Sequence, residues 1–158
     1  MTSPWTGNFL ALVAGMIAPL AFAPFFFYPV AFVSLILLFL SWDGADARLA
    51  AIRGWLFGFG LFGVGVSWIF VAIHVFGQAS VLLAGLLTAL FVGFLALYTA
   101  GLGYAIKRLC RSDWFSNYDF ILLLPITWLV FEWFKAWFLT GFPWLEFGVS
   151  QLDGPLSE

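Results

Sequence analysis

Residues Met1–Trp42 read MTSPWTGNFLALVAGMIAPLAFAPFFFYPVAFVSLILLFLSW, and none of them is Asp, Glu, Lys or Arg. A single helix through this stretch would be about 63 Å long, roughly twice the thickness of the hydrocarbon layer of a membrane. The chain must therefore turn back, and prolines mark the place because proline removes a backbone donor and clashes with the preceding helical turn. We predict two short membrane spans, 7–23 and 29–42, joined by a turn at Pro24–Pro29.

The composition of the whole chain also indicates a lipid environment. Hydrophobic residues make up 64% of the 158 residues and charged residues 9%, whereas a soluble domain has about 45–50% and about 25%. The later apolar stretches predict three more spans, at 52–76, 81–106 and 120–139. We therefore expect an all-α fold, a polytopic transmembrane bundle of about five helices that occupies 1–158, with 140–158 as an external loop.

The positions of the basic residues predict the orientation of these spans. Five of the six Lys and Arg residues lie in the stretches that join spans two and three and spans four and five: Arg48, Arg53, Lys107, Arg108 and Arg111. Cytoplasmic loops of membrane proteins carry an excess of such residues. The chain should therefore start in the cytoplasm, and the segment after Leu139 should lie outside.

Small residues recur on one face of the third span and on one face of the fourth. They are Gly54, Gly58 and Gly65 in the third span, and Gly85, Ala89, Gly93 and Gly101 in the fourth. Small residues let helix backbones approach closely in lipid. We predict that both faces form seams between helices.

Few side chains within the spans could carry chemistry. Glu132 lies twelve residues into the fifth span, and Lys135 follows on the same helical face. The two side chains are either a structural ion pair or part of a site for a lipid head group. His74, the single histidine, is expected to form an interfacial hydrogen bond. No metal-ligand spacing, phosphate-binding loop or basic tract is present, so we expect no metal, cofactor or nucleic acid.

The segment LTGFPWLEFGVSQLDGPL (Leu139–Leu156) strongly resembles a loop of bacterial apolipoprotein N-acyltransferases. Upstream, GFGLFG (Gly58–Gly63) followed by SWI (Ser67–Ile69) and Glu132 with a basic residue three positions on are similar to the same family, in the same order. The family usually has Arg where this chain has Lys135, and Lys cannot form a bidentate pair with a carboxylate.

The resemblance implies a multi-pass enzyme of the bacterial inner membrane, with residue 158 in the periplasm. In the family, a nitrilase-like domain after two further helices holds the catalytic Glu, Lys and Cys, so this chain should contain no catalytic residue. Cys110 is not the nucleophile, because it is expected on the cytoplasmic side. The implied partners are the bilayer, a phospholipid acyl donor and a diacylglyceryl-modified apolipoprotein acceptor. The acyl group passes through a thioester, and the fragment alone should be inactive.

What this chain could contribute is a lipid-facing platform. Phe142, Pro143 and Trp144 lie in the external loop, where both substrates would approach, and together with Glu132 they are the candidate substrate-binding residues. Trp144 either positions a lipid head group or acyl chain, or only anchors the loop in the interface. The alternative for the whole chain is a non-enzymatic membrane module, such as a transporter fragment or a scaffold.

Overall fold

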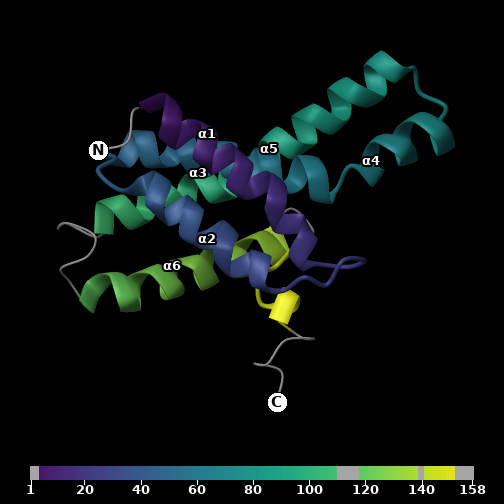
Figure 1. Ribbon diagram of the computed structural model, residues 1–158. Coiled ribbons are helices and arrows are strands. Elements are labelled where there is room, and N and C mark those ends of the chain that lie inside the picture. Colours follow the sequence, from purple (N-terminus) through teal and green to yellow (C-terminus); the bar gives the residue numbers. More distant parts are fainter. Residues whose placement is uncertain (1–3, 110–117, 139–140, 152–158) are drawn as a thin grey trace.

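The computed structural model describes residues 4–109, 118–138 and 141–151, and all regular structure in these ranges is helical (Figure 1). The predicted all-α class is therefore confirmed for the described residues. The elements are α1 (Pro4–Ile17) with a 3₁₀ turn (Ala18–Ala21), α2 (Pro29–Trp42), α3 (Ala47–Gly65), α4 (Trp68–Val71) with a π-helical turn (Ala72–Phe76), α5 (Val81–Leu109), α6 (Tyr118–Trp137) and a final 3₁₀ turn (Val149–Gln151).

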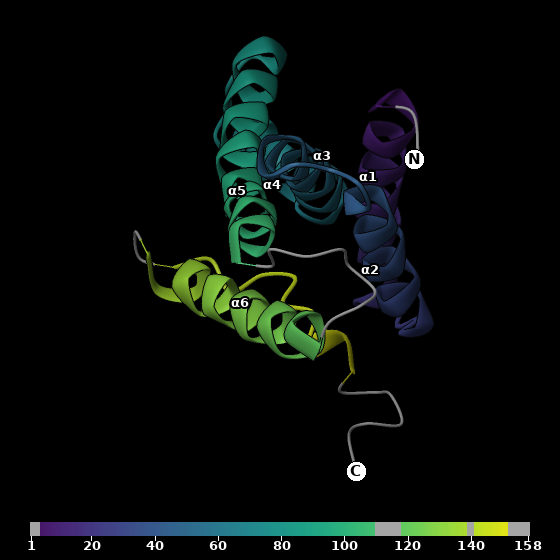
Figure 2. The ribbon, with the colours of Figure 1, turned by 90° about the vertical axis from the view of Figure 1, so that its left-hand side faces the viewer.

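The central helix of the bundle is α3, which packs between α1 and α5. A Cβ atom on Gly15 of α1 would collide with the Phe57 carbonyl of α3, and one on Gly54 would collide with the Thr99 carbonyl of α5. Glycine is required at both positions because the backbones touch there. Figure 2 shows α1, α3 and α5 side by side, with α6 as a separate layer below them.

The predicted glycine seams are confirmed in part. Gly54 and Gly58 of α3 face α5, as the spacing indicates, whereas Gly65 faces the side chain of Leu145. The prediction for α5 is confirmed only in part: a Cβ on Gly93 would meet Trp55 of α3 and one on Gly101 would meet Phe131 of α6, whereas one on Gly85 would meet no atom of the described residues within 4 Å. Closer to the end of α5, small and polar residues form its closest contact with α3: Ala96, Thr99 and Gly103.

The predicted third span is interrupted. After α3 ends at Gly65, the chain leaves helical geometry at Val66, and α4 begins at Trp68. The α4 helix, its π-helical extension and the first turns of α5 project from the bundle as a hairpin (Figure 1). His74 closes the turn of this hairpin with a hydrogen bond of 2.8 Å between its Nδ1 atom and the Ala79 carbonyl oxygen.

The two ends of the bundle differ in chemistry. Because α3 and α5 are antiparallel, with Ala50 beside Gly103, the basic residues at the start of α3 and at the end of α5 lie at one end, here called the basic end. The opposite end carries the turn 22–28 and the segment 141–151 (Figure 1). We call it the loop end, and we call 141–151 the return loop.

Among the described helices, α3 and α5 are long and apolar enough to cross a membrane. The apolar helices α1 and α2 are shorter, with 14 residues each. At 29 residues, α5 is about 43 Å long and exceeds the hydrocarbon thickness. The five predicted spans thus remain a prediction, and two membrane-length helices are what the structure supports.

The close contact between α3 and α5 at Gly54 can be tested by substitution. Gly54→Ala should lower the free energy of unfolding by about 1–3 kcal/mol, because the added methyl group collides with the α5 backbone. Gly85→Ala is the matched control and should be neutral or stabilise the helix by up to about 1 kcal/mol. Denaturation of both variants in detergent micelles measures the difference. Equal stability of the two variants would contradict the α3–α5 packing.

Candidate functional site

The return loop begins with a sharp reversal after α6. Gly141 adopts a φ of +83°, and a Cβ atom there would collide with the Ala136 carbonyl oxygen. The Gly141 amide donates a hydrogen bond to the Phe138 carbonyl, and the Phe142 amide donates one to the Lys135 carbonyl, both at 3.0 Å. Only glycine fits this combination of left-handed backbone and close approach. The reversal directs the loop back onto the bundle.

Lys135 and Glu132 hold the loop through its backbone. The Lys135 Nζ atom donates a hydrogen bond of 2.8 Å to the carbonyl oxygen of Trp144. The Oε1 atom of Glu132 accepts a hydrogen bond of 2.9 Å from the amide of Phe147. The two side chains that the sequence predicts to be either an ion pair or part of a head-group site thus each form a charge-assisted hydrogen bond with the loop.

Neighbouring carboxylates partly offset the cost of burying the ammonium group. Lys135 is only 5% exposed, and its charge is attracted by the carboxylates of Glu132 and Glu146. Its Nζ atom lies 5.5 Å from the ring centroid of Phe62, in a cation–π arrangement. A buried charge is tolerated only when such partners replace water. These contacts give Lys135 a defined place under the loop.

Phe147 anchors the loop by its side chain. The ring is 7% exposed and lies 6.0 Å from the ring of Phe22, 6.3 Å from Phe57 and 5.3 Å from Trp128, measured between centroids. The contacts with Phe22 and Trp128 are edge-to-face, an arrangement that aromatic rings favour. A single residue of the loop therefore joins the turn that follows α1 and its 3₁₀ extension, helix α3 and helix α6.

Three of the four candidate residues come together in front of this anchor. Phe142 lies partly buried between the rings of Phe91, at 5.3 Å, and Trp144, at 5.8 Å. Pro143 is exposed, and Trp144 is 50% exposed. Glu132, the fourth candidate, lies behind the loop and bonds to the Phe147 amide. Pro143 and Trp144 are thus exposed, Phe142 packs against the bundle, and the carboxylate supports the loop.

The sequence reasoning missed the structural partners of these residues. Phe147 stands in an irregular segment, where no helical or strand period marks its side chain as buried. The contact of Trp144 with Trp68, at 6.0 Å between ring centroids, depends on the break after α3. Only the spacing of Glu132 and Lys135 signalled that this turn of α6 has a special role.

Within residues 4–109, 118–138 and 141–151, no cluster of three His, Cys, Asp or Glu side chains could hold a metal ion. The sequence-based assignment of Cys110 to the cytoplasmic side concerns a residue outside the described ranges. The arrangement around the return loop is therefore one of binding and support. It brings aromatic faces, an exposed proline and a half-exposed indole to one surface.

The amino-acid sequence is similar to those of known proteins over nearly its whole length. The family model described as the apolipoprotein N-acyltransferase N-terminal domain matches residues 14–158. The apolipoprotein N-acyltransferase of Pseudomonas syringae pv. tomato is 47% identical over 153 residues, and that of Azotobacter vinelandii is 47% identical over 157; both alignments cover 97% of this chain. The Coxiella burnetii protein of the same name is 48% identical over 147 residues, 93% of this chain. The chain spans about 30% of the length of these curated relatives.

The hydrogen bond by which Glu132 holds the return loop can be tested by substitution. Glu132→Ala should lower the free energy of unfolding by about 1–3 kcal/mol, because it leaves the Phe147 amide without its acceptor. Glu132→Gln keeps an oxygen at the same position and should lose less than half of that. Denaturation in detergent and the rate of proteolysis in the return loop measure both effects. If Glu132→Gln lowers the free energy of unfolding as much as Glu132→Ala, the negative charge of Glu132 stabilises the loop more than the hydrogen bond to the Phe147 amide does.

Proposed function

The chain belongs to the apolipoprotein N-acyltransferase family, and we propose that it is the membrane-embedded N-terminal part of an enzyme that acylates bacterial lipoproteins. The proposed donor is a phospholipid, and the proposed acceptor is the α-amino group of a diacylglyceryl-cysteine. The observation that carries the proposal is the match of the family's N-terminal domain over residues 14–158. The names of the relatives supply the acceptor.

The proposed location is the bacterial inner membrane, with about five spans. Apolar side chains cover the outside of the long helices; Leu82 and Leu90 of α5 and Leu129 of α6 are among the most exposed. Such surfaces are stable in lipid and not in water. With the basic end in the cytoplasm, as the positive-inside rule requires, the loop end faces the periplasm. The return loop then lies at the outer interface.

The proposed chemistry takes place in two steps outside this chain. As the family resemblance implies, a Cys thiolate attacks an ester carbonyl of the phospholipid, forms a thioester and releases a lysophospholipid. The amine of the lipoprotein then attacks the thioester, forms an amide and releases the thiolate. The present chain supplies the platform on which lipid approaches, with Pro143 and Trp144 exposed at its surface and Phe142 partly buried beside them.

The role of Trp144 can be tested in the full-length enzyme. Trp144→Ala should slow formation of the acyl-enzyme by about tenfold, which corresponds to about 1.4 kcal/mol of lost lipid contact. Trp5→Ala is the control, since Trp5 is also an exposed tryptophan but lies at the start of α1. The measurement is single-turnover thioester formation followed by transfer to a lipopeptide. Unchanged rates would exclude Trp144 from substrate positioning.

The proposed absence of catalytic residues from this chain can also be tested. The 158-residue chain by itself should form no thioester and transfer no acyl chain to a lipopeptide in detergent, because the proposed catalytic residues belong to another domain. The assay is mass spectrometry of the chain and of the lipopeptide after incubation with phospholipid. Acyl transfer above the rate without protein would show that this part carries chemistry of its own.

A further inference from the structure

Beside the return loop, the loop end contains a cleft of about 420 Å³. Its walls come from three places: Phe22 and Ala23 just after the 3₁₀ turn, Gly65 at the end of α3 with Trp68 at the start of α4, and the return loop with Pro143 and Trp144. Both polar and apolar atoms line it. A second groove of similar size, between α2 and α6, is lined almost wholly by apolar atoms. The first cleft is thus the amphipathic one.

Trp68 reaches this cleft because α3 stops short. The chain leaves helical geometry at Val66 and resumes it at Trp68, so the indole is not continuous with the α3 face. The rings of Trp68 and Trp144 lie 6.0 Å apart at an angle of 50°. The side chains are 49% and 50% exposed, respectively. The two indoles therefore form one wall that remains open to a ligand.

The floor of the cleft is formed by a close contact between the loop and α3. A Cβ atom on Gly65 would collide with the side chain of Leu145, so the loop can lie against the helix end only at a glycine. The Trp144 carbonyl is held from below by Lys135. The wall is therefore fixed on both sides, by the end of α3 and by α6.

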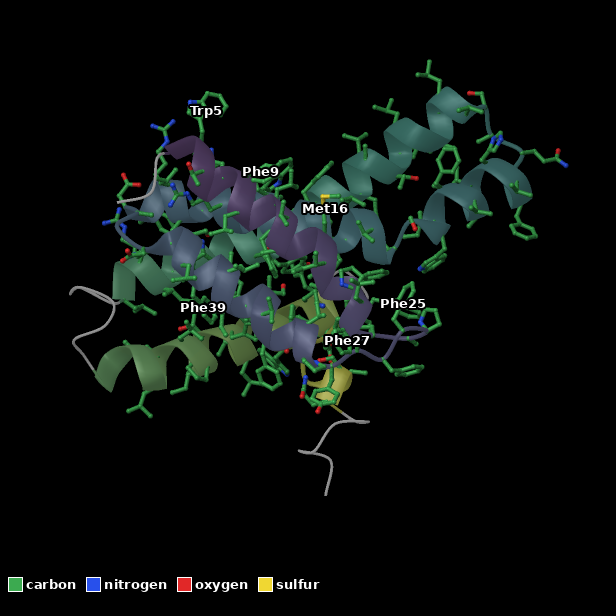
Figure 3. All side chains as sticks on the ribbon, viewed as in Figure 1. Trp5, Phe9, Met16, Phe25, Phe27 and Phe39 are labelled. Carbon is green, nitrogen blue, oxygen red and sulfur yellow. The ribbon has the colours of Figure 1, made fainter. Side chains whose placement is uncertain are left out.

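The turn 22–28, which adjoins the cleft, indicates how deep in the membrane the cleft lies. Phe25, Phe26 and Phe27 follow the residues of the cleft wall and are all exposed. Figure 3 shows Phe25 and Phe27 projecting from the bundle at this end. These phenylalanine rings are apolar and suit lipid, whereas amphipathic indoles such as those of Trp68 and Trp144 beside them are typical of the interface between hydrocarbon and head groups. The ester groups of phospholipids occupy that same layer.

We propose that Trp68, together with Trp144, binds the ester region of a phospholipid. An indole offers an apolar face and a single N–H donor. The faces of the two rings contact the first methylene groups of an acyl chain, and the N–H groups donate hydrogen bonds to ester carbonyl oxygens. This ligand matches a cleft in which polar and apolar atoms meet, whereas the α2/α6 groove is lined almost wholly by apolar atoms. The inference rests on the proposed function in placing the loop end at the outer interface.

The test uses the full-length protein in nanodiscs of phosphatidylcholine. One probe is a diacyl phosphatidylcholine with a diazirine near the ester, and the other is its dialkyl ether analogue, which has no carbonyl groups. After photolysis, mass spectrometry measures labelling of the peptides that contain Trp68 and the return loop. Trp68→Phe keeps an aromatic ring and removes the N–H donor. Trp133→Phe is the control, since Trp133 is exposed on α6 and does not line the cleft.

The wild-type protein should label with the ester probe at least several times more strongly than with the ether probe. Trp68→Phe should lower labelling by the ester probe about fivefold, the effect of one hydrogen bond, and leave the ether probe unchanged. Trp133→Phe should change neither. Equal labelling by both probes, or an unchanged ester signal in Trp68→Phe, would overturn the proposal.

The same measurements distinguish failure of the Trp68 site from failure of the proposed function. Labelling does not require acyl transfer. If the wild-type protein labels equally with both probes but still forms the thioester at its normal rate, the Trp68 site is refuted and the proposed function is not. Absence of labelling on every helix would show that the chain is not embedded in lipid, and both proposals would then fail. Circular dichroism and the unfolding midpoint of Trp68→Phe confirm that the variant is folded. A Trp68→Ala variant should lose labelling by the ester probe at least as strongly as Trp68→Phe.

Discussion

The contact of the α3 backbone with the backbones of α1 and α5 is the constraint on which the rest of the structure depends. Gly15 and Gly54 allow these approaches, since a side chain at either position would separate the helices. In lipid, where apolar burial does not drive association, close van der Waals contact of this kind holds helices together. The position of α3 then decides where its last residue, Gly65, meets Leu145 of the return loop.

The charged groups show how an apolar chain accommodates the few it has. Arg53 is 1% exposed, and its guanidinium group donates to the Asn8 side chain at 3.3 Å and to the Ser41 carbonyl. Lys135 donates to the Trp144 carbonyl. In both cases a backbone carbonyl from another segment replaces water, which avoids the cost of an unsatisfied buried charge. Each charge therefore also joins segments that are distant in the sequence.

Several elements follow from local features of the sequence. Helix α2 begins at Pro29 and ends at Trp42, just before the first charged residues, because proline is favoured in a first helical turn and the apolar run ends there. The break after Gly65 was not foreseen, because no proline or charge marks it in the uncharged run that contains it. The α5 seam was predicted only in part, because glycine spacing does not show which helix will cover each glycine: Gly93 meets α3 and Gly101 meets α6.

The amino-acid sequence by itself determined the helical class, the apolar character of the chain and the family, because composition, prolines and motifs are local properties. The tertiary structure alone decided that Glu132 and Lys135 bond to the return loop, that Phe147 is its anchor and that Trp68 meets Trp144. These contacts join segments whose relative positions depend on how helices pack. Helical periodicity indicates which face of a helix is apolar, but not which distant residue will cover it.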